Sequence, residues 1–387
     1  MSNNLKETYH GKKIDNANIL NVDSAIKKLN GSPVVIVTGV TGQDGSLMVD
    51  YLLKNTDYQI FGGVRRLSVF NHRNINHINN DRFSLVNFDL TDSHTISRII
   101  EKLKPAYFIN FAAQSFVGSS WDFPRQTFET NCLSVLDILE SIRLYANSCR
   151  VYQAGSSEEF GNVSYTPQDE NHPLKPRSPY GASKSSARQL IKVYRDSYNM
   201  YAVQGWLFNH EGTRRGEEFV SRKISKNIAI IQKLIKENRE FKTLKLGNIH
   251  AKRDWSDAED FIDGIWRMLN QEKYNKNFKE VKDYVLSSGE LHTVSEFVKE
   301  GFKIAGIEGK WINETPEIPE NEKFIEEKTN KILVEIDPKF YRPAEVDLLL
   351  GDSKLAQEEL GWKKITDFKD LVKKMVENDI QEINQIS

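Results

Sequence analysis

The chain has 387 residues, of which 39% are hydrophobic and 28% charged, a composition typical of a globular protein with a large core and room for two lobes. Its formal net charge of -1 gives no reason to expect a nucleic acid or a membrane as a partner. Because the only two cysteines, Cys132 and Cys149, have no metal-ligand spacing, we expect neither disulfides nor a bound metal, and we expect a reducing compartment, the cytoplasm.

Residues 1–30 are polar and rich in Asn and Lys. They lack the apolar core of a secretion signal, and we find no stretch of the chain with the apolar length that a membrane span requires. We interpret these residues as an N-terminal extension that packs either on the fold or on a partner subunit.

Short apolar runs alternate with helical stretches from Pro33 onward. Runs that are apolar along their whole length are typical of parallel strands covered by helices on both faces. The pattern predicts an α/β fold with a doubly wound parallel Rossmann sheet, in a first domain over residues 31–210. The predicted strands are Val34–Thr38, Gln59–Val64, Ser84–Phe88, Tyr107–Phe111, Cys149–Ala154 and Met200–Phe208.

The second half is less regular and predicts a smaller mixed α/β domain over residues 211–387, with segments near 243–290 returning partly to the first domain. The acidic stretch Trp311–Lys331 is expected to be a surface loop. The other expected elements are helices over Ser221–Glu237, from Ser256, over Ser353–Leu360 and over Phe368–Ile380, and strands near Leu244 and Tyr284.

Three glycines, Gly39, Gly42 and Gly45, lie between the first predicted strand and the helix after it. Glycines at this place allow a tight turn and a close approach of the backbone to a pyrophosphate, which the helix N-terminus attracts. The same triplet also occurs in ordinary turns, but at the start of a series of alternating strands and helices it favours dinucleotide binding.

The end of the second strand indicates which nicotinamide cofactor is bound. An acidic residue there would hold the ribose 2′-hydroxyl of NAD, whereas this chain has Arg65 and Arg66, about 20 residues after the last glycine. Guanidinium groups suit a 2′-phosphate, so we predict NADP rather than two merely solvated arginines. After the third strand, Asp89 is expected either to bind the adenine edge or to cap the next helix.

Tyr180 and Lys184 are four residues apart in a predicted helix that begins near Pro179, so both lie on one helical face. A tyrosine is a weak base at neutral pH, but a nearby lysine cation favours its phenolate. The spacing alone is common on helices. Behind an NADP-type Rossmann half it predicts an acid/base pair.

Ser156 and Glu158 follow the strand that ends at Ala154, and therefore lie at the carboxyl edge of the sheet, where ligands of open α/β sheets bind. Ser156 can hydrogen-bond a substrate hydroxyl. Glu158 is either a helix-start carboxylate or an additional acid/base. Hydride transfer does not need a further acid/base, but elimination of water does.

Several longer motifs make the chain resemble the extended short-chain dehydrogenase/reductases and, more specifically over about residues 34–379, the GDP-mannose 4,6-dehydratases. The motifs are Thr38–Ser46, Val64–Arg66, Pro176–Lys184, Leu207–Glu211, Arg214–Gly216, Arg222–Ile224, Leu246–Asn248, Arg253–Trp255 and Tyr341–Val346. The resemblance implies a lyase that oxidises the sugar at C4, eliminates water across C5 and C6 and returns hydride to C6, converting GDP-mannose to GDP-4-keto-6-deoxymannose.

The resemblance also assigns residues to three roles. The implied catalytic set is Ser156, Glu158, Tyr180 and Lys184. The implied NADP contacts, besides Tyr180 and Lys184, are Gly39, Thr41, Gly42, Gln43, Asp44, Gly45, Arg65, Asp89, Leu90, Phe111, Ala112, Ala113, Gln114, Ser115, His210 and Arg215. The implied nucleotide-sugar contacts are Ser115, Asn209, Lys223, Gly247, Asn248, Arg253, Arg342 and Glu345.

The chain departs from the family pattern around the sugar site. Ser156 replaces a usual Thr, Glu159-Phe160 replaces a frequent Leu-Tyr, and Phe116 and Trp121 replace a frequent His and Phe. These changes leave a GDP-heptose open as the substrate beside GDP-mannose. A GDP-sugar reductase or epimerase on the same scaffold, and a non-catalytic NADP-sensing or interaction protein, stay open as well. The resemblance further implies a homodimer or homotetramer, with the loop Leu67–Asp81 reaching a neighbouring subunit.

Overall fold

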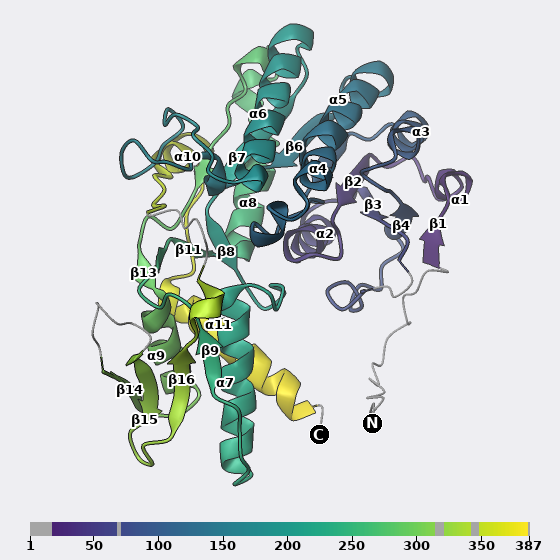
Figure 1. Ribbon diagram of the computed structural model, residues 1–387. Coiled ribbons are helices and arrows are strands. Elements are labelled where there is room, and N and C mark those ends of the chain that lie inside the picture. Colours follow the sequence, from purple (N-terminus) through teal and green to yellow (C-terminus); the bar gives the residue numbers. More distant parts are fainter. Residues whose placement is uncertain (1–17, 68–70, 314–320, 342–347, 386–387) are drawn as a thin grey trace. The chain divides into compact units, whose positions relative to one another are not determined.

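A computed structural model describes residues 18–67, 71–313, 321–341 and 348–385, which belong to two compact units (Figure 1). Unit 1 comprises the chain up to Phe208 together with Ala258–Leu286 and Gly351–Lys363. Unit 2 comprises Asn209–Asp257, Ser287–Leu350 and the residues from Lys364 onward. Each unit is therefore assembled from segments far apart in the sequence. The sequence pattern did not indicate that Gly351–Lys363 belongs to unit 1.

Unit 1 is built on a sheet of eight strands among the described residues, and every neighbouring pair in it is parallel. The order across the sheet is β1 (Ile19–Leu20), β4 (Phe83–Asn87), β3 (Gln59–Val64), β2 (Val34–Thr38), β5 (Tyr107–Asn110), β6 (Arg150–Ala154), β7 (Ala202–Leu207) and β12 (Val285–Leu286). The strand order reverses at β2, which is the doubly wound topology, so the predicted Rossmann sheet is confirmed.

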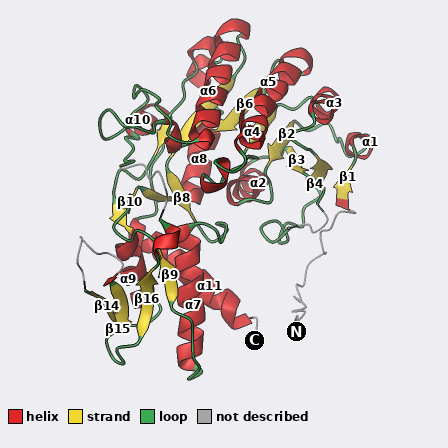
Figure 2. Ribbon diagram, in the orientation of Figure 1, coloured by secondary structure: helices red, strands yellow, loops and turns green. Residues whose placement is uncertain are grey.

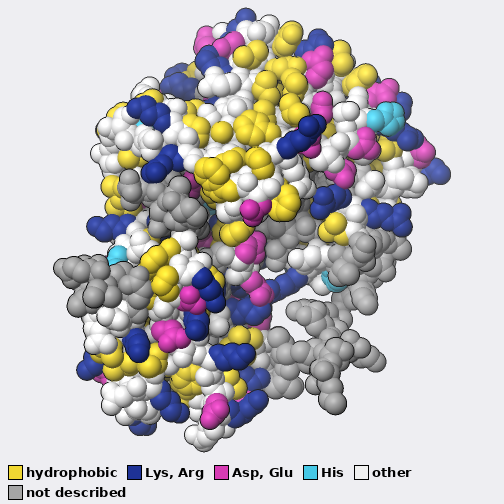
Figure 3. Space-filling view, in the orientation of Figure 1, with side chains coloured by type: hydrophobic (Ala, Val, Ile, Leu, Met, Phe, Trp, Pro, Cys, Tyr) yellow, Lys and Arg dark blue, Asp and Glu magenta, His cyan; other side chains and the backbone are white. Residues whose placement is uncertain are grey.

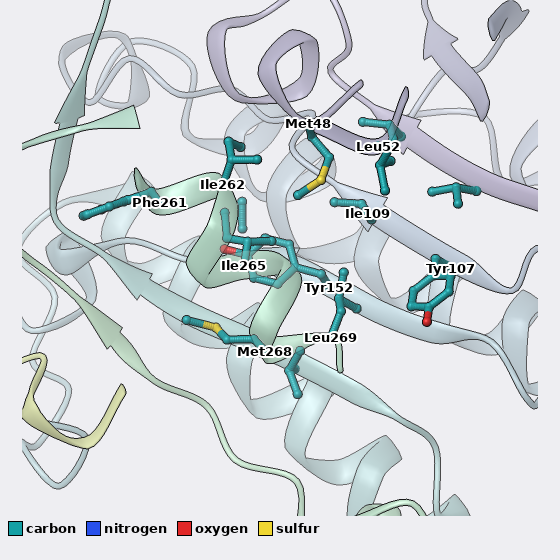
Figure 4. Packing of buried hydrophobic residues seen from close by; sticks show 14 of the residues in the cluster. Met48, Leu52, Tyr107, Ile109, Tyr152, Phe261, Ile262, Ile265, Met268 and Leu269 are labelled. Carbon is teal, nitrogen blue, oxygen red and sulfur yellow. The ribbon is translucent and has the colours of Figure 1, made fainter. Parts of the chain in front are cut away.

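Helices cover both faces of this sheet, which explains why its central strands are mostly apolar. On one face, α2 (Gln43–Asn55) and α8 (Ala258–Met268) pack on β5 and β6 through Met48, Leu52, Ile262 and Ile265 (Figure 4). The other face is covered by α3 (Ser93–Leu103), α5 (Ser134–Tyr145) and α6 (Pro179–Tyr198). The short helix α4 (Pro124–Phe128) precedes α5.

The described part of the N-terminal extension packs on its own fold. Strand β1 pairs with β4 at the edge of the sheet, and the following helix α1 (Val22–Ile26) is capped by the Asn21 side chain. Ala25 is fully buried in the core beside α3. Of the two placements expected for residues 1–30, packing on the fold applies to residues 18–30.

The described part of unit 2 consists mainly of a small sheet and three helices (Figure 2). The sheet has the order β14 (Gly309–Ile312), β15 (Lys323–Glu326), β16 (Ile332–Ile336) and β9 (Leu244–Leu246). The helices α7 (Val220–Lys236), α9 (Val294–Ile304) and α11 (Phe368–Gln385) share one apolar core with it. Two strand pairs complete the unit, β8 (Asn209–Glu211) with β11 (Trp255–Asp257), and β10 (Lys252–Arg253) with β13 (His292–Thr293).

The prediction of a surface loop over Trp311–Lys331 was wrong for the residues of this stretch that the structure describes, while residues 314–320 lie outside them. The end of β14 and all of β15 lie in this stretch and pair with each other, and Phe324 is fully buried against Phe302 and Trp311. The sequence pattern did not predict this short strand because the stretch is acidic and the strand has few apolar side chains. In unit 1, the remaining helix α10 (Lys354–Leu360) lies close to the predicted position. Within the described residues, we find no helix with both the length and the apolar character to cross a bilayer.

Candidate active site

The glycine loop between β2 and α2 has the close backbone contacts that the motif suggested. Gly39 has a φ of +66°, and a Cβ there would lie 2.7 Å from the backbone nitrogen of Ala112. A Cβ on Gly45 would lie 2.3 Å from the Gly39 carbonyl oxygen. Larger residues at both positions would separate the loop from β5 and from α2. The first turn of α2 therefore lies directly beside the loop and is suited to a phosphate group.

The residues after β3 and β4 lie at the same carboxyl edge of the sheet as this loop. Arg65, directly after β3, is exposed. Asp89 accepts hydrogen bonds from the backbone nitrogen and the hydroxyl of Thr91 at 2.9 and 2.8 Å. Helix α3 is capped by Asp92 instead, so the interpretation of Asp89 as the helix cap was wrong. Leu90 is buried beside it.

The segment Phe111–Ser115 follows β5 and is clamped by a residue that the sequence pattern did not indicate. Asn131, which is buried, accepts a hydrogen bond from the Gln114 backbone nitrogen at 2.8 Å and donates to the Gln114 carbonyl oxygen at 3.0 Å. Its amide also donates to the Ser183 hydroxyl at 3.1 Å, on helix α6. Asn131 lies in a stretch of π-helix, Glu129–Leu133, between α4 and α5. It fixes the segment after β5 to helix α6.

Helix α6 begins with Ser178 as its cap and Pro179 in its first turn. Tyr180 and Lys184 are both buried, and the ammonium nitrogen of Lys184 lies 5.8 Å from the centre of the Tyr180 ring. Burial lowers the pKa of Lys184 to about 8, while the carboxylates of Glu159 and Asp44 act in the opposite direction. The predicted pair therefore shares one helical face.

A chain of buried polar groups crosses the sheet toward Lys184. The hydroxyl of Thr38 and the amide of Asn110 are hydrogen-bonded, and Asn110 donates to Gln153 at 2.7 Å. The Ala154 carbonyl oxygen then accepts from both the Gln153 amide, at 3.2 Å, and the Lys184 ammonium, at 2.9 Å. Sequence reasoning missed this chain, although a polar residue inside an apolar strand, as in Tyr-Phe-Ile-Asn and Val-Tyr-Gln-Ala, was the signal for it.

Ser156 and Glu158 lie in the turn after β6, and Ser156 begins the 3-10 helix Ser157–Glu159. The Ser156 hydroxyl accepts from the Glu158 backbone nitrogen at 3.2 Å. A Cβ on Gly181 would lie 2.6 Å from the Glu158 carbonyl oxygen, so this turn packs directly against the first turn of α6. Glu158 is half-buried. The four predicted catalytic residues thus come from two segments in contact within unit 1.

Strand β8 in unit 2 carries Asn209 and His210, both half-buried, which pair with Trp255 and Ser256 of β11. After β8, Arg215 forms an ion pair with Glu211 at 3.0 Å, and its guanidinium lies 3.6 Å from the centre of the Phe219 ring. These contacts hold the Arg215 side chain against its own unit.

The predicted substrate residues Lys223 and Gly247 lie together in unit 2, around a third residue that sequence reasoning missed. The Lys223 ammonium lies 3.6 Å from the centre of the Phe340 ring and donates to the Lys245 carbonyl oxygen at 2.7 Å. A Cβ on Gly247 would lie 2.6 Å from the Phe340 carbonyl oxygen. Burial lowers the pKa of Lys223, and the neighbouring charge of Lys339 adds to this.

The other predicted substrate residues are less firmly placed. Asn248 is exposed and accepts from the His250 backbone nitrogen at 3.0 Å. Arg253 lies on β10, opposite His292 of β13. Arg342 and Glu345 lie outside the described residues.

The fold is shared with solved enzymes that act on nucleotide sugars. UDP-glucose 4-epimerase from Thermotoga maritima superimposes with a TM-score of 0.71 at 21% identity, covering 90% of this chain and 99% of that one. A dTDP-glucose 4,6-dehydratase from Bacillus anthracis superimposes with a TM-score of 0.69 at 20% identity, covering 92% and 98%. At this identity the likeness defines the class of fold.

Sequence comparison is more specific. A family model described as GDP-mannose 4,6 dehydratase matches residues 36–375. The GDP-mannose 4,6 dehydratases of Drosophila melanogaster and Homo sapiens are 40% and 39% identical, covering 90% of this chain and 86% and 91% of theirs. The chain therefore belongs to the GDP-mannose 4,6-dehydratase family, as its motifs predicted.

Proposed function

We propose that this chain is an NADP-dependent hydro-lyase that converts GDP-mannose to GDP-4-keto-6-deoxymannose. The observation that carries the proposal is the contact between two segments of unit 1, the helix with Tyr180 and Lys184 and the turn with Ser156 and Glu158. An acid/base pair for oxidation and a separate carboxylate for elimination are thereby brought to one sheet edge, in a member of this family.

In the first step, Tyr180 removes the proton of the C4 hydroxyl. The buried Lys184 cation, 5.8 Å from the ring centre, favours the phenolate form that accepts this proton. NADP, when bound, supplies the exchange of a hydride, taken from C4 and returned to C6, so that the overall reaction involves no net oxidation.

Elimination is assigned to the turn after β6. A ketone at C4 makes the C5 proton acidic, and Glu158 removes it as general base. Glu158 passes this proton to the C6 hydroxyl, which leaves as water while Ser156 donates a hydrogen bond to it, and Tyr180 returns the proton that it took from the C4 hydroxyl to C5. Glu158 is half-buried, and the capping box of this turn is closed by Ser156 and Glu159.

The residues at the carboxyl edge of unit 1 fit NADP. Gly39 and Gly45 allow the loop to pack closely against the residues after β5 and against the start of α2, so that the first turn of α2 lies beside the loop, where the pyrophosphate would lie. Arg65 is exposed directly after β3, where it would meet the 2′-phosphate. The assignments of Thr41, Gln43, Asp44, Asp89, Leu90 and Phe111–Ser115 extend this proposal. His210 and Arg215 of unit 2 are proposed as further NADP contacts.

For the GDP-sugar, we propose Lys223, Gly247 and Phe340 as the core of the binding residues in unit 2. An ammonium group beside an aromatic ring suits a diphosphate next to a flat base. Asn248 and Arg253 are proposed to bind polar groups of the same ligand. Ser115, Asn209, Arg342 and Glu345 are assigned from the family resemblance.

We propose mannose as the sugar of the substrate. The substitutions that left a GDP-heptose open differ in whether their side chains are buried or exposed. Phe160 is fully buried and stacks on Trp206 with ring centres 5.9 Å apart, and Glu159 is fully buried as well. Both belong to the packing of unit 1. Phe116 and Trp121 are exposed, so they and Ser156, which is assigned to the C6 hydroxyl, are the departures that remain available to a sugar.

Mass spectrometry of products from GDP-hexoses and GDP-heptoses, with NADP in catalytic amount, tests the proposal. We expect loss of water from GDP-mannose without accumulation of NADPH. Consumption of NADPH in proportion to product would indicate a reductase, and a product isomer of unchanged mass would indicate an epimerase. Faster turnover of a GDP-heptose than of GDP-mannose would indicate that the heptose is the substrate. A Glu158→Gln variant should bind NADP and GDP-mannose but form no dehydrated product, and wild-type turnover in it would contradict the role of Glu158.

We further propose a homo-oligomer in the cytoplasm. Apolar side chains gather on the face of unit 1 formed by α4 to α6 (Figure 3), where Leu133, Leu144 and Val193 are each more than half exposed. In the loop Leu67–Asp81, Ile75 is buried in unit 1 and Asn74 donates to the Thr41 carbonyl oxygen at 3.0 Å, so this part contributes to its own subunit. Buried free thiols at Cys132 and Cys149 support a reducing compartment. Sedimentation of the full chain as a monomer would contradict the oligomer.

A further inference from the structure

A buried ion pair connects the two segments that carry the candidate catalytic residues. The side chain of Glu159 is 0% accessible, and that of its partner Arg188 is 5% accessible. The Arg188 Nε donates to Glu159 Oε2 at 2.6 Å, and a second guanidinium nitrogen lies 3.4 Å from Oε1. Glu159 stands where the resembling family frequently has Leu.

The Glu159 carboxylate also binds the turn that contains Ser156 and Glu158. Its Oε1 accepts a hydrogen bond from the Ser156 backbone nitrogen at 2.8 Å, which closes the capping box at the start of the turn. The same oxygen accepts from the Gln204 amide at 3.0 Å, and this amide reaches the Lys184 carbonyl oxygen at 3.3 Å. One carboxylate is thus shared by the turn, by β7 and by α6.

Arg188 ties the same carboxylate to the helix that carries Tyr180 and Lys184. It lies four residues after Lys184 and eight after Tyr180, on the same helical face. Its guanidinium donates to the Gln204 carbonyl oxygen at 2.7 Å and lies 3.4 Å from the centre of the Trp206 ring. Both contacts fix the rotation of α6 against β7.

The residues around the Glu159–Arg188 pair pack so closely against it that they fix its geometry. A Cβ on Gly155 would lie 2.8 Å from Glu159 Oε1 and 2.8 Å from an Arg188 nitrogen. Beyond Arg188, Asp283 accepts a hydrogen bond from Arg195 at 2.9 Å. Burial alone would raise the pKa of Asp283, but the positive charges of Arg195 and Arg188 outweigh this effect and lower it. Two carboxylates and two guanidiniums balance within this cluster.

We propose that Glu159 is a positioning residue, whose carboxylate, paired with Arg188, aligns the turn carrying Ser156 and Glu158 with the helix carrying Tyr180 and Lys184. This inference rests on the proposed function, since it assumes the catalytic roles of those four residues. The Glu159 side chain is fully buried and is not among the residues proposed to bind sugar or cofactor. It acts through the backbone of Ser156 and through α6.

The charge of Glu159 has a second consequence, for Lys184. The titratable groups that face Lys184 are Tyr180 on its own helix, Glu159 on the turn and Asp44 on α2. The same two carboxylates and Arg188 act on the buried Tyr152. Burial lowers the pKa of Lys184 to about 8, and the negative charge of Glu159 limits this shift. Without that charge, the cation would be lost at lower pH.

The test compares the full chain with Glu159→Gln by the pH dependence of kcat and KM for GDP-mannose. We expect kcat to fall by roughly tenfold to a hundredfold, because small misalignments of reacting groups have effects of this size. KM should change by no more than about threefold, since the binding residues are untouched. The alkaline limb of the kcat profile should move to lower pH. A folded Glu159→Gln variant with wild-type kcat and profile would overturn the proposal.

Two further variants address folding. Glu159→Asp keeps the charge but shortens the side chain, so we expect a lowered kcat with an unmoved alkaline limb. The double variant Glu159→Leu with Arg188→Leu removes both charges, and we expect it to recover thermal stability but not the wild-type pH profile. The proposal would be overturned if the double variant recovered the wild-type kcat and pH profile, or if Glu159→Asp had the wild-type kcat. Either result would show that the ion pair contributes only to packing.

Asp379→Asn provides a matched control, because Asp379 pairs at 2.7 Å with the equally buried Arg222 between α7 and α11 of unit 2. It should lower the melting temperature and leave the alkaline limb in place; a limb that moves here as well would show that destabilisation alone shifts it.

Tyr180→Phe separates the two proposals. If Tyr180→Phe retains activity, the proposed site is wrong, whereas an inactive Tyr180→Phe beside fully active Glu159 variants contradicts this inference alone.

Discussion

The candidate catalytic residues of unit 1 and the candidate GDP-sugar residues of unit 2 are held in different ways. Ser156, Tyr180 and Lys184 are all less than one tenth exposed, and backbone or buried side-chain contacts fix each of them. In unit 2, Lys223 is half-buried and Asn248 is exposed. On the proposed roles, three of the four reacting groups are held by buried contacts, with Glu158 half-buried, while recognition of the nucleotide depends on more accessible side chains. Changes in unit 1 should therefore lower kcat, and changes in unit 2 should raise KM.

The largest effect is expected from Tyr180→Phe. Removing the hydroxyl removes the acid/base of the first step, so kcat should fall by on the order of a hundredfold to ten-thousandfold. Because the ring and its packing remain, NADP affinity measured by titration should stay close to wild type. A variant that loses NADP binding and activity together would show that unit 1 does not separate chemistry from binding in this way.

A smaller effect is expected from Lys223→Ala. The lost ammonium is half-buried beside Phe340, and hydrogen bonds to charged groups contribute about 1.5–3 kcal/mol, so KM for GDP-mannose should rise roughly tenfold to a hundredfold. The value of kcat should change much less, as steady-state kinetics will reveal. Lys339→Ala, one position before Phe340, is the matched control for charge alone. A fall in kcat with constant KM in Lys223→Ala would reverse the comparison between the units.

Arg65→Ala tests an exposed contact within unit 1. We expect the dissociation constant for NADP to rise roughly tenfold while that for NAD hardly changes, because only NADP has the 2′-phosphate. Arg66→Ala is the neighbouring control. Equal weakening of both cofactors would exclude a 2′-phosphate contact for Arg65.

The smallest predicted effect is on pH dependence. The pKa of Lys184 is lowered by burial to about 8, so its cation is present below that pH and is lost as the pH rises through it. The rate should therefore decrease to about half near this pH, because neutral Lys184 no longer favours the phenolate. A kcat profile that stays level up to about pH 10, well above this pKa, would contradict the role of the lysine charge.

The parts of the fold that the sequence predicted well are those with continuous apolar strands. β2 and β3 begin and end at the predicted residues, since helices on both faces favour apolar side chains at most positions. β15 was missed because only Phe324 and Ile325 of its four residues are apolar and the surrounding stretch is acidic. Local pattern also did not reveal that Gly351–Lys363 belongs to unit 1, because that depends on contacts distant in sequence.

The candidate site shows the same division. Tyr180 and Lys184 were predictable because a four-residue spacing on a helix is a local property. Asn131 and the pair of Glu159 with Arg188 were not, because each is defined by partners 17 to 52 residues away along the chain. These polar residues position others because they are buried, and burial of a polar residue cannot be predicted from a single sequence.

The most direct test of the central claim uses GDP-mannose labelled with deuterium at C4, incubated with the enzyme and NADP in catalytic amount. The proposed reaction transfers that label within the sugar from C4 to C6. The predicted product is lighter by one water and keeps the deuterium, and NADPH does not accumulate. A product that has lost the label, or NADPH formed in proportion to product, would contradict the assignment of this chain as a 4,6-dehydratase.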